Sequence, residues 1–180
     1  MMLIILESFQ PSYNSALHYV SSLGVGETAL IYNISIILFG TTVVISSSII
    51  AKLVGKKLYI LFLFIAGIFV IGVGVFPENI RPMHGIVTPF TFIFATLSAL
   101  ASFRSLNAPF SYISISIGLI TVVTMTLFFN YVGLPAESTI TFLGLAKGTI
   151  ERIIIYPLTF WLISLSIYLN NNNAHKDSYH

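Results

Sequence analysis

The chain has 180 residues, of which 56% are hydrophobic and only 8% are charged, and its formal net charge is +2. Soluble domains carry about a quarter charged residues, so this composition excludes an ordinary soluble domain and predicts one compact integral membrane domain. The lack of cysteine excludes disulfides, thiolate metal sites and covalent haem attachment. The few, scattered basic residues give no indication of a nucleic-acid partner.

The first 29 residues are too interrupted to cross a membrane. Four apolar residues within them recur at the spacing of one helical face: Tyr13, Ala16, Leu17 and Val20. This spacing predicts a short amphipathic helix that begins near Ser12 and ends near Gly24. We expect this N-terminal segment, residues 1–29, to lie at the membrane interface or over one end of the protein.

Five apolar runs follow, and each is long enough to cross roughly 30 Å of hydrocarbon as a helix. They cover about residues 30–51, 58–76, 84–103, 109–132 and 150–169, and residues 170–180 form a polar C-terminal tail. The connections are short, so successive helices should pack as antiparallel neighbours. The sequence therefore predicts an all-α, polytopic membrane bundle of five transmembrane helices plus a short N-terminal interfacial helix.

Small residues should mark the contacts between these helices, because lipid provides no hydrophobic driving force for their association. Gly67, Gly72 and Gly74 form a stripe along the second run. Gly40 in the first run offers a partner for this stripe. We therefore expect the first two spans to approach each other closely.

The distribution of basic residues predicts the orientation in the membrane. One side carries Lys52, Lys56, Lys57, Arg104 and Lys176, whereas the other carries Arg81, Lys147 and Arg152. The side with more basic residues is normally cytoplasmic, which places the N-terminus outside and the C-terminus inside a plasma membrane. Five of the six acidic residues then fall on the outer side.

Two polar stretches interrupt the apolar chain at the same expected depth. The loop GVFPENIRPMHG joins the second and third runs, and the fifth run opens with GTIERIIIYP. Together they place six polar side chains on the outer side: Glu78, Arg81, His84, Glu151, Arg152 and Tyr156. The helix dipole favours a carboxylate in the first turn, as at Glu151, and Arg152 shares a helix face with Tyr156. We expect these six side chains to form one polar cluster.

The charges of this cluster need partners, because an unpaired charge within the apolar zone costs roughly 2.5–3.5 kcal/mol. Three arrangements satisfy them: Glu78 with Arg152, Glu151 with Arg81, or a network that includes His84. Any of these would close the outer end of the bundle. The cluster then acts as a structural anchor, as a site for a lipid head group or small polar ligand, or, least of all, in catalysis.

No motif assigns an enzymatic activity to the chain. It contains no zinc-binding H-E-x-x-H helix, no G-x-S-x-G elbow and no phosphate-binding loop, and no aspartate precedes Asp177. We therefore predict no catalytic residues, no cofactor and no metal. The middles of the first four runs lack ionisable residues, which argues against an ion pathway.

Three segments taken together resemble a known family. They are SSLGVGETALIYNISIILFG (21–40), GVGVFPENIRPMHG (72–85) and GTIERIIIYPLTFW (148–161). In this order they are similar to the domain-of-unknown-function 998 family of archaeal and bacterial multi-pass membrane proteins. The resemblance implies a polytopic fold and a plasma-membrane location, but no activity. Members usually have a further helix where only MMLIIL stands here, so either that span is lost or the true start lies upstream.

The function that we expect first is that of an accessory or structural subunit in a larger membrane assembly, with membrane lipids and other membrane-protein subunits as partners. The alternative is an outer-leaflet lipid- or small-ligand-binding protein, or a membrane-lipid enzyme, that uses the polar cluster. A small transporter or channel is the second alternative.

Overall fold

The computed structural model describes residues 2–131 and 138–177 of the chain. Its α-helices are α1 (Met2–Ser8), α2 (Ala29–Val54), α3 (Leu58–Val75), α4 (Met83–Ser102), α5 (Phe110–Phe128) and α6 (Lys147–Asp177). Its short 3-10 helices are η1 (Val20–Gly24), η2 (Gly26–Thr28) and η3 (Phe129–Tyr131), and its two strands are β1 (Thr141–Phe142) and β2 (Leu145–Ala146). Helices α2 to α6 are each long and apolar enough to cross a membrane. The protein is therefore an all-α, multi-pass membrane bundle, as the sequence predicts.

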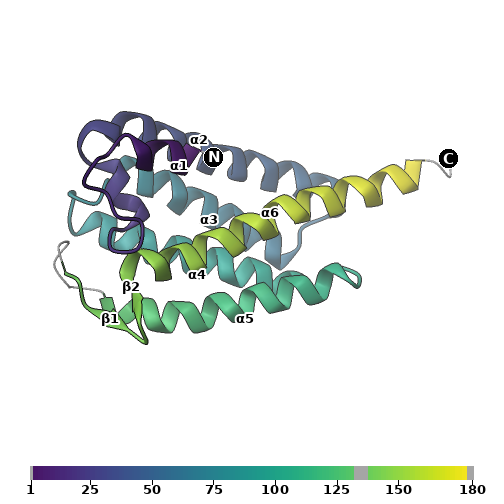
Figure 1. Ribbon diagram of the computed structural model, residues 1–180. Helices are drawn as coiled ribbons and strands as arrows, with labels where there is room; N and C mark the ends of the chain where they lie inside the picture. The colour runs from purple at the N-terminus through teal and green to yellow at the C-terminus, as the bar shows by residue number, and fades with distance from the viewer. Residues whose placement is uncertain (1, 132–137, 178–180) are drawn as a thin grey trace.

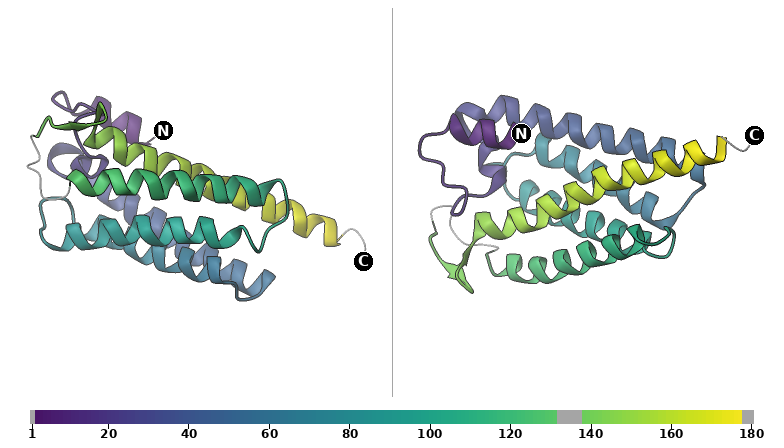
Figure 2. Two further views of the ribbon diagram at one scale, coloured as in Figure 1. Left: turned by 90° about the horizontal axis from the view of Figure 1, so that it is seen from below. Right: turned by 45° about the vertical axis from the view of Figure 1, so that its right-hand side comes forward.

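Successive long helices lie side by side (Figure 1): α2 packs on α3, α3 on α4, α4 on α5 and α5 on α6. Helix α6 runs obliquely across the bundle and extends past the ends of the other helices (Figure 2). It also contacts α4, whereas its contact with α2 is slight. Helices α2 and α6 are thus not packed neighbours along their length.

The close approach of α2 and α3 is confirmed at two glycines. A Cβ atom on Gly40 would lie 2.7 Å from the backbone nitrogen of Ile71 and 2.8 Å from the carbonyl oxygen of Gly67. A Cβ atom on Gly67 would lie 3.1 Å from the carbonyl oxygen of Gly40. Only glycine permits this backbone-to-backbone contact, which is how membrane helices gain packing energy in the absence of a hydrophobic drive.

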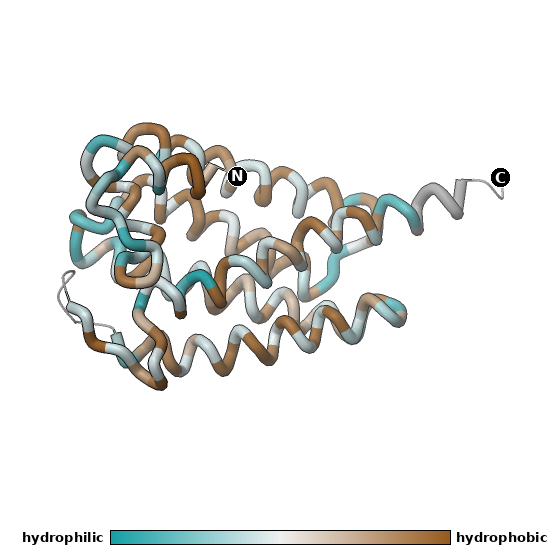
Figure 3. The backbone as a smooth tube through the Cα atoms, in the orientation of Figure 1, coloured by the Kyte–Doolittle hydropathy of each residue, from teal (hydrophilic) through white to brown (hydrophobic). Residues whose placement is uncertain are grey.

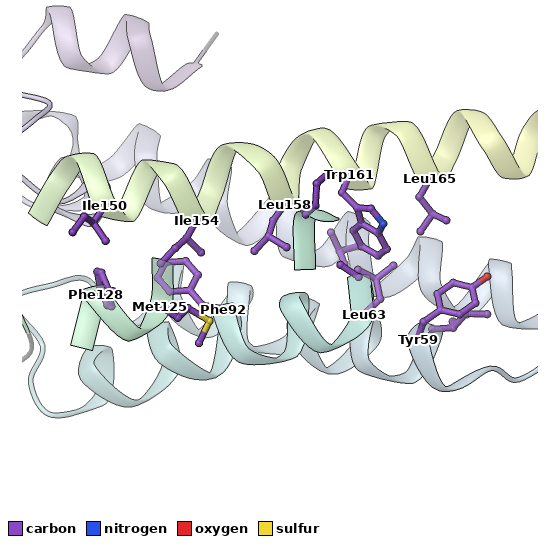
Figure 4. Close-up of a cluster of buried hydrophobic side chains, with 14 of the residues drawn as sticks. Tyr59, Leu63, Phe92, Met125, Phe128, Ile150, Ile154, Leu158, Trp161 and Leu165 are labelled. Carbon is purple, nitrogen blue, oxygen red and sulfur yellow. The ribbon is translucent and has the colours of Figure 1, made fainter. Parts of the chain in front are cut away.

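The apolar core follows one face of α6 (Figure 4). That face carries Ile150, Ile154, Leu158, Trp161 and Leu165, all of them buried. They pack in one cluster with Tyr59 and Leu63 of α3, Phe92 of α4, and Met125 and Phe128 of α5. The buried indole nitrogen of Trp161 donates to the hydroxyl of Ser114 at 2.9 Å, so it is satisfied. Figure 3 shows that the long helices are mostly apolar and that hydrophilic residues gather in the segments at their ends.

The N-terminal segment contains a helix at a different place from the one predicted. It spans Met2–Ser8, whereas the predicted range from Ser12 to Gly24 contains turns and then η1. One cause is Asn14, whose side-chain oxygen accepts from the backbone nitrogens of Ala16 and Leu17 at 2.9 and 3.3 Å, because such local bonds compete with a helix. A second cause is that Arg152 and Thr149 of α6 donate hydrogen bonds to backbone carbonyls of this segment, as described below.

The connection that precedes α6 contains structure that the sequence did not reveal. Strands β1 and β2 pair antiparallel, with Thr141 opposite Ala146. The two residues between them, Leu143 and Gly144, both have positive φ, of 54° and 74°, as in the tight two-residue turns that connect the strands of a β-hairpin. Helix α6 then begins at Lys147, and it continues into the segment predicted to be a polar tail.

Candidate functional site

Residues 2–28 cover one end of the bundle, and we call this segment the cap. Its apolar side chains form a small core of their own with α2: Leu6, Val20, Leu23 and Tyr32, all buried. The cap is therefore packed on the bundle. We call the end of the bundle that it covers the cap end.

Arg152, in the first turns of α6, binds the cap through its guanidinium group. Its Nη2 donates to Glu7 Oε1 at 2.5 Å and to the Tyr13 hydroxyl at 2.7 Å. Its Nη1 donates to the backbone carbonyls of Ser15 at 2.6 Å and His18 at 3.3 Å. Arg152 is only 9% exposed, so these bonds replace the water that the buried charge has lost.

The Tyr13 hydroxyl extends this network. It accepts from Arg152 and donates to the carbonyl of Tyr19 at 2.9 Å. Burial raises the pKa of the Tyr13 phenol to about 12, and the nearby Arg152 charge offsets only part of that rise. The phenol is therefore neutral at physiological pH and keeps the proton that it donates.

Gly148 allows the cap to approach α6. A Cβ atom at this position would lie 2.1 Å from the carbonyl oxygen of His18 and 2.6 Å from that of Ser15. These are the carbonyls that accept from Arg152. The backbone nitrogen of Thr149 also donates to the Ala16 carbonyl at 3.2 Å. The first turns of α6 thus bind the cap through the backbone carbonyls of the cap.

Glu151 points toward the interior of the bundle. Consecutive helix residues lie about 100° apart around the axis, so Glu151 and its neighbour Arg152 serve different faces. Glu151 is 2% exposed, and its Oε2 accepts a short hydrogen bond from the backbone nitrogen of Val20. Val20 begins η1, where backbone N–H groups lack partners within the helix. Glu151 therefore caps η1 from another part of the chain.

Glu78 approaches the cap from the loop between α3 and α4. Its Oε2 accepts from the hydroxyl of Ser22 at 2.5 Å. Its Oε1 is buried and has no hydrogen-bond partner among the residues that the structure describes. An acceptor of this kind is costly unless a donor from outside the chain reaches it.

His84 is 8% exposed, and both of its ring nitrogens are engaged. Nδ1 lies 2.7 Å from the carbonyl oxygen of Phe76, and Nε2 lies 3.1 Å from the hydroxyl of Thr88. A carbonyl can only accept, so Nδ1 carries a proton and His84 fixes the start of α4 to the end of α3. Within the described residues, no three histidine or acidic side chains are grouped in a way that could hold a metal ion.

The predicted pairings were wrong, although five of the six predicted residues do gather at the cap end. Arg152 pairs with Glu7, not with Glu78, and Glu151 binds a backbone nitrogen, not Arg81. Glu78, Arg81, His84 and Glu151 line one hollow beneath the cap, and Arg152 binds the cap itself. Arg81 is exposed and makes no hydrogen bond or ion pair with any described residue.

Tyr156 does not join the hydrogen-bonded network. It is 47% exposed and lies with Pro157 on an outward face of α6. The residues that sequence reasoning missed are Glu7, Tyr13 and Gly148. The one available signal was that Glu7 is expected on the same side of the membrane as the other four glutamates.

Two hollows meet beneath the cap. The first, the bundle pocket, has a volume of about 140 Å³ and lies between α2, α3, α4 and α6. Its wall is almost entirely apolar and includes Val43, Ala66, Val70, Phe92 and Trp161. The second, the vestibule, has a volume of about 410 Å³, and its wall is also mostly apolar, but it contains the charged and polar side chains of Glu78, Arg81 and His84. Ser21, Thr88 and Glu151 line both hollows. A hollow without charged side chains apart from Glu151 and a hollow that also contains Glu78, Arg81 and His84 therefore share a boundary at Glu151.

Comparison with known proteins identifies one family. The sequence model of a family described as "Protein of unknown function (DUF998)" matches residues 1–168. The matched range includes the cap, both hollows and nearly all of the five long helices. No curated protein and no solved structure matches the chain.

Proposed function

The chain belongs to the DUF998 family, and on that premise we propose that this multi-pass membrane protein binds one amphipathic, lipid-like molecule at its cap end. The polar head of this molecule lies in the vestibule, and the first part of its chain enters the bundle pocket. The observation that carries the proposal is the shared boundary at Glu151, where the bundle pocket meets a hollow that contains the charged and polar side chains of the cap end. A water-soluble ligand would leave the bundle pocket unfilled, and a pure hydrocarbon would leave the charged side chains of the vestibule without partners.

The size of the bundle pocket limits what it can hold. A protein cavity of about 150 Å³ admits a molecule the size of benzene, so about 140 Å³ accommodates only the first several carbons of a chain. The rest of the chain must leave the protein. Helices α2 and α6 make little contact, and both line the pocket, so the route between them leads into the bilayer.

We place the cap end on the outer side of a plasma membrane. The loop ends away from the cap carry more basic side chains: Lys52, Lys56, Lys57 and Arg104. The bias of basic residues toward the cytoplasm supports this orientation. The bound molecule then comes from the outer leaflet.

Filling the bundle pocket tests the proposal. Val70 lines the pocket, so Val70→Phe should expel the chain, whereas Val75→Phe makes the same change at an exposed position of the same helix. Lipids extracted from the purified protein are quantified by mass spectrometry. We expect about one equivalent of one lipid class in the wild type and in Val75→Phe, and a loss of about ten-fold in Val70→Phe. Equal retention in the two variants, or no retained lipid in the wild type, would refute the proposal.

The second candidate is a role as an accessory subunit, which the extension of α6 past the other helices favours (Figure 1). An extended helix that leaves its bundle has surface available for another protein. Purification from the native membrane in mild detergent tests this role. A single monodisperse species at 19.8 kDa, with no companion protein, would argue against it.

A further inference from the structure

We infer that the molecule bound at this site carries a primary ammonium group at the head of its chain, and that the vestibule selects this head over an anionic one. The inference rests on the proposed lipid binding and adds the chemical class of the ligand. Glu78 and Glu151 are the two groups that recognise the ammonium.

The selectivity of binding has to come from the head group, because the hydrocarbon chain contributes little to the difference in affinity between amphiphiles. A lipid chain in the bilayer is already out of water, and its surroundings are as apolar as the wall of the bundle pocket. Moving the chain into the pocket therefore yields no hydrophobic gain. What distinguishes one membrane amphiphile from another is how its head matches the vestibule.

The vestibule offers acceptors to that head. Glu78 Oε1 is buried and receives no hydrogen bond from any described residue. Glu151 is almost fully buried, uses Oε2 for the Val20 nitrogen, and stands where the two hollows meet. Buried carboxylate oxygens gain most from donors that also carry positive charge. A primary ammonium brings three N–H donors and one positive charge.

Among the residues that the structure describes, no arginine donates to Glu78 Oε1. Arg152 directs its guanidinium to Glu7, Tyr13 and the cap carbonyls, and it does not line the vestibule. Arg81 is the one described lysine or arginine that lines the vestibule, and its side chain is exposed to solvent. An anionic head near Glu78 would meet a like charge in a partly dehydrated site, which is unfavourable.

The single tryptophan of the chain provides a local readout. Trp161 lines the bundle pocket, so a brominated chain that enters the pocket quenches its fluorescence. Three amphiphiles with one identical hydrocarbon, brominated on the first several carbons after the head, are compared: the amine, the alcohol and the carboxylic acid. The protein is held in nanodiscs of unbrominated phosphatidylcholine at neutral pH, where an alkylamine is charged as lysine is. Val70→Phe gives the background that arises from bulk lipid.

We expect the amine to quench Trp161 at a concentration about ten-fold lower than the acid does, with the alcohol between them. Glu78→Gln and Glu151→Gln should each remove most of this preference, and in Glu151→Gln the new amide group still offers an oxygen to the Val20 nitrogen. Glu27→Gln, the same change at an exposed position of the cap that lines neither hollow, should leave it intact. Should Glu151→Gln fail to fold, Glu78→Gln carries the test.

The outcomes separate the two proposals. Quenching by the acid at the same concentration as the amine overturns the ammonium assignment and leaves lipid binding standing. Quenching by none of the three above the Val70→Phe background overturns lipid binding itself. A soluble short-chain amine that competes as well as the long-chain one would place the ligand in water and overturn the amphiphile class.

Discussion

Arg152 Nη2 lies 2.5 Å from Glu7 Oε1, and this ion pair joins the last long helix to the first residues of the chain. The two side chains are 11% and 21% exposed, so little water screens the pair. Together with the bonds from Arg152 to Tyr13 and to the cap carbonyls, it holds the cap over both hollows. The binding site that we propose therefore depends on a contact between residues that lie far apart in the sequence.

Removing this arginine should destabilise the protein by roughly 2–3 kcal/mol, below the usual cost of breaking a fully buried pair because Glu7 keeps some contact with water. The measurement is a double-mutant cycle of Glu7→Gln and Arg152→Gln, read as thermal unfolding in detergent. We expect the two losses to be non-additive by about 1 kcal/mol or more.

The same cycle with Glu78→Gln in place of Glu7→Gln serves as the control. Glu78 binds Ser22 and not Arg152, so these two losses should add within about 0.5 kcal/mol. Coupling between Glu78 and Arg152 of the size expected for Glu7 would contradict the observed pairing.

Gly148→Ala should loosen the cap without removing any polar group. The added methyl group would meet the backbone carbonyls of His18 and Ser15, so the cap loop has to move away from α6. Overpacking of this kind costs about 1–3 kcal/mol, and here it also lengthens the bonds to Arg152. The matched control is Gly85→Ala, since no atom lies within 4 Å of a Cβ built at Gly85. Equal thermal stability of the two variants would show that the cap does not rest on Gly148.

The bundle itself could be predicted from the sequence, because membrane spans are specified locally. Each run of apolar residues must form a helix in hydrocarbon, where every backbone group needs a partner within the segment. The contact between Gly40 and Gly67 was predictable for the same reason: small residues are what lets two such helices touch. Neither conclusion requires knowledge of distant parts of the chain.

The cap and its pairings were not predictable, because they are tertiary. The spacing of Tyr13, Ala16, Leu17 and Val20 fits a helix. Backbone carbonyls of this segment instead accept hydrogen bonds from Arg152, so the segment forms a loop. The sequence showed that Arg152 needs a partner, but the choice of Glu7 over Glu78 follows from where α1 packs. The bundle pocket likewise lies between α2 and α6, where these helices make only slight contact, and no local pattern records this.

His84 should behave as a structural residue and not as a metal ligand. Both of its ring nitrogens have partners, Phe76 and Thr88, so zinc added to the purified protein should leave the melting temperature unchanged. His84→Ala leaves the Phe76 carbonyl without its donor and should cost about 1–3 kcal/mol. A rise in melting temperature with zinc that His84→Ala abolishes would show instead that a ring nitrogen is available.

Alkaline pH should weaken the cap through Tyr13. Its pKa is about 12 in the folded protein, against 10.0 for an unperturbed tyrosine, because burial disfavours the phenolate. Below pH 10 the phenol is protonated in both states, so its contribution is fully present. Between pH 10 and about 12 the unfolded chain loses this proton and the folded chain keeps it, so stability falls as pH rises. Tyr13→Phe should lower the melting temperature at pH 8, where its two hydrogen bonds are lost, and flatten the decline above pH 10. An unchanged alkaline slope in Tyr13→Phe would show that other groups cause the decline.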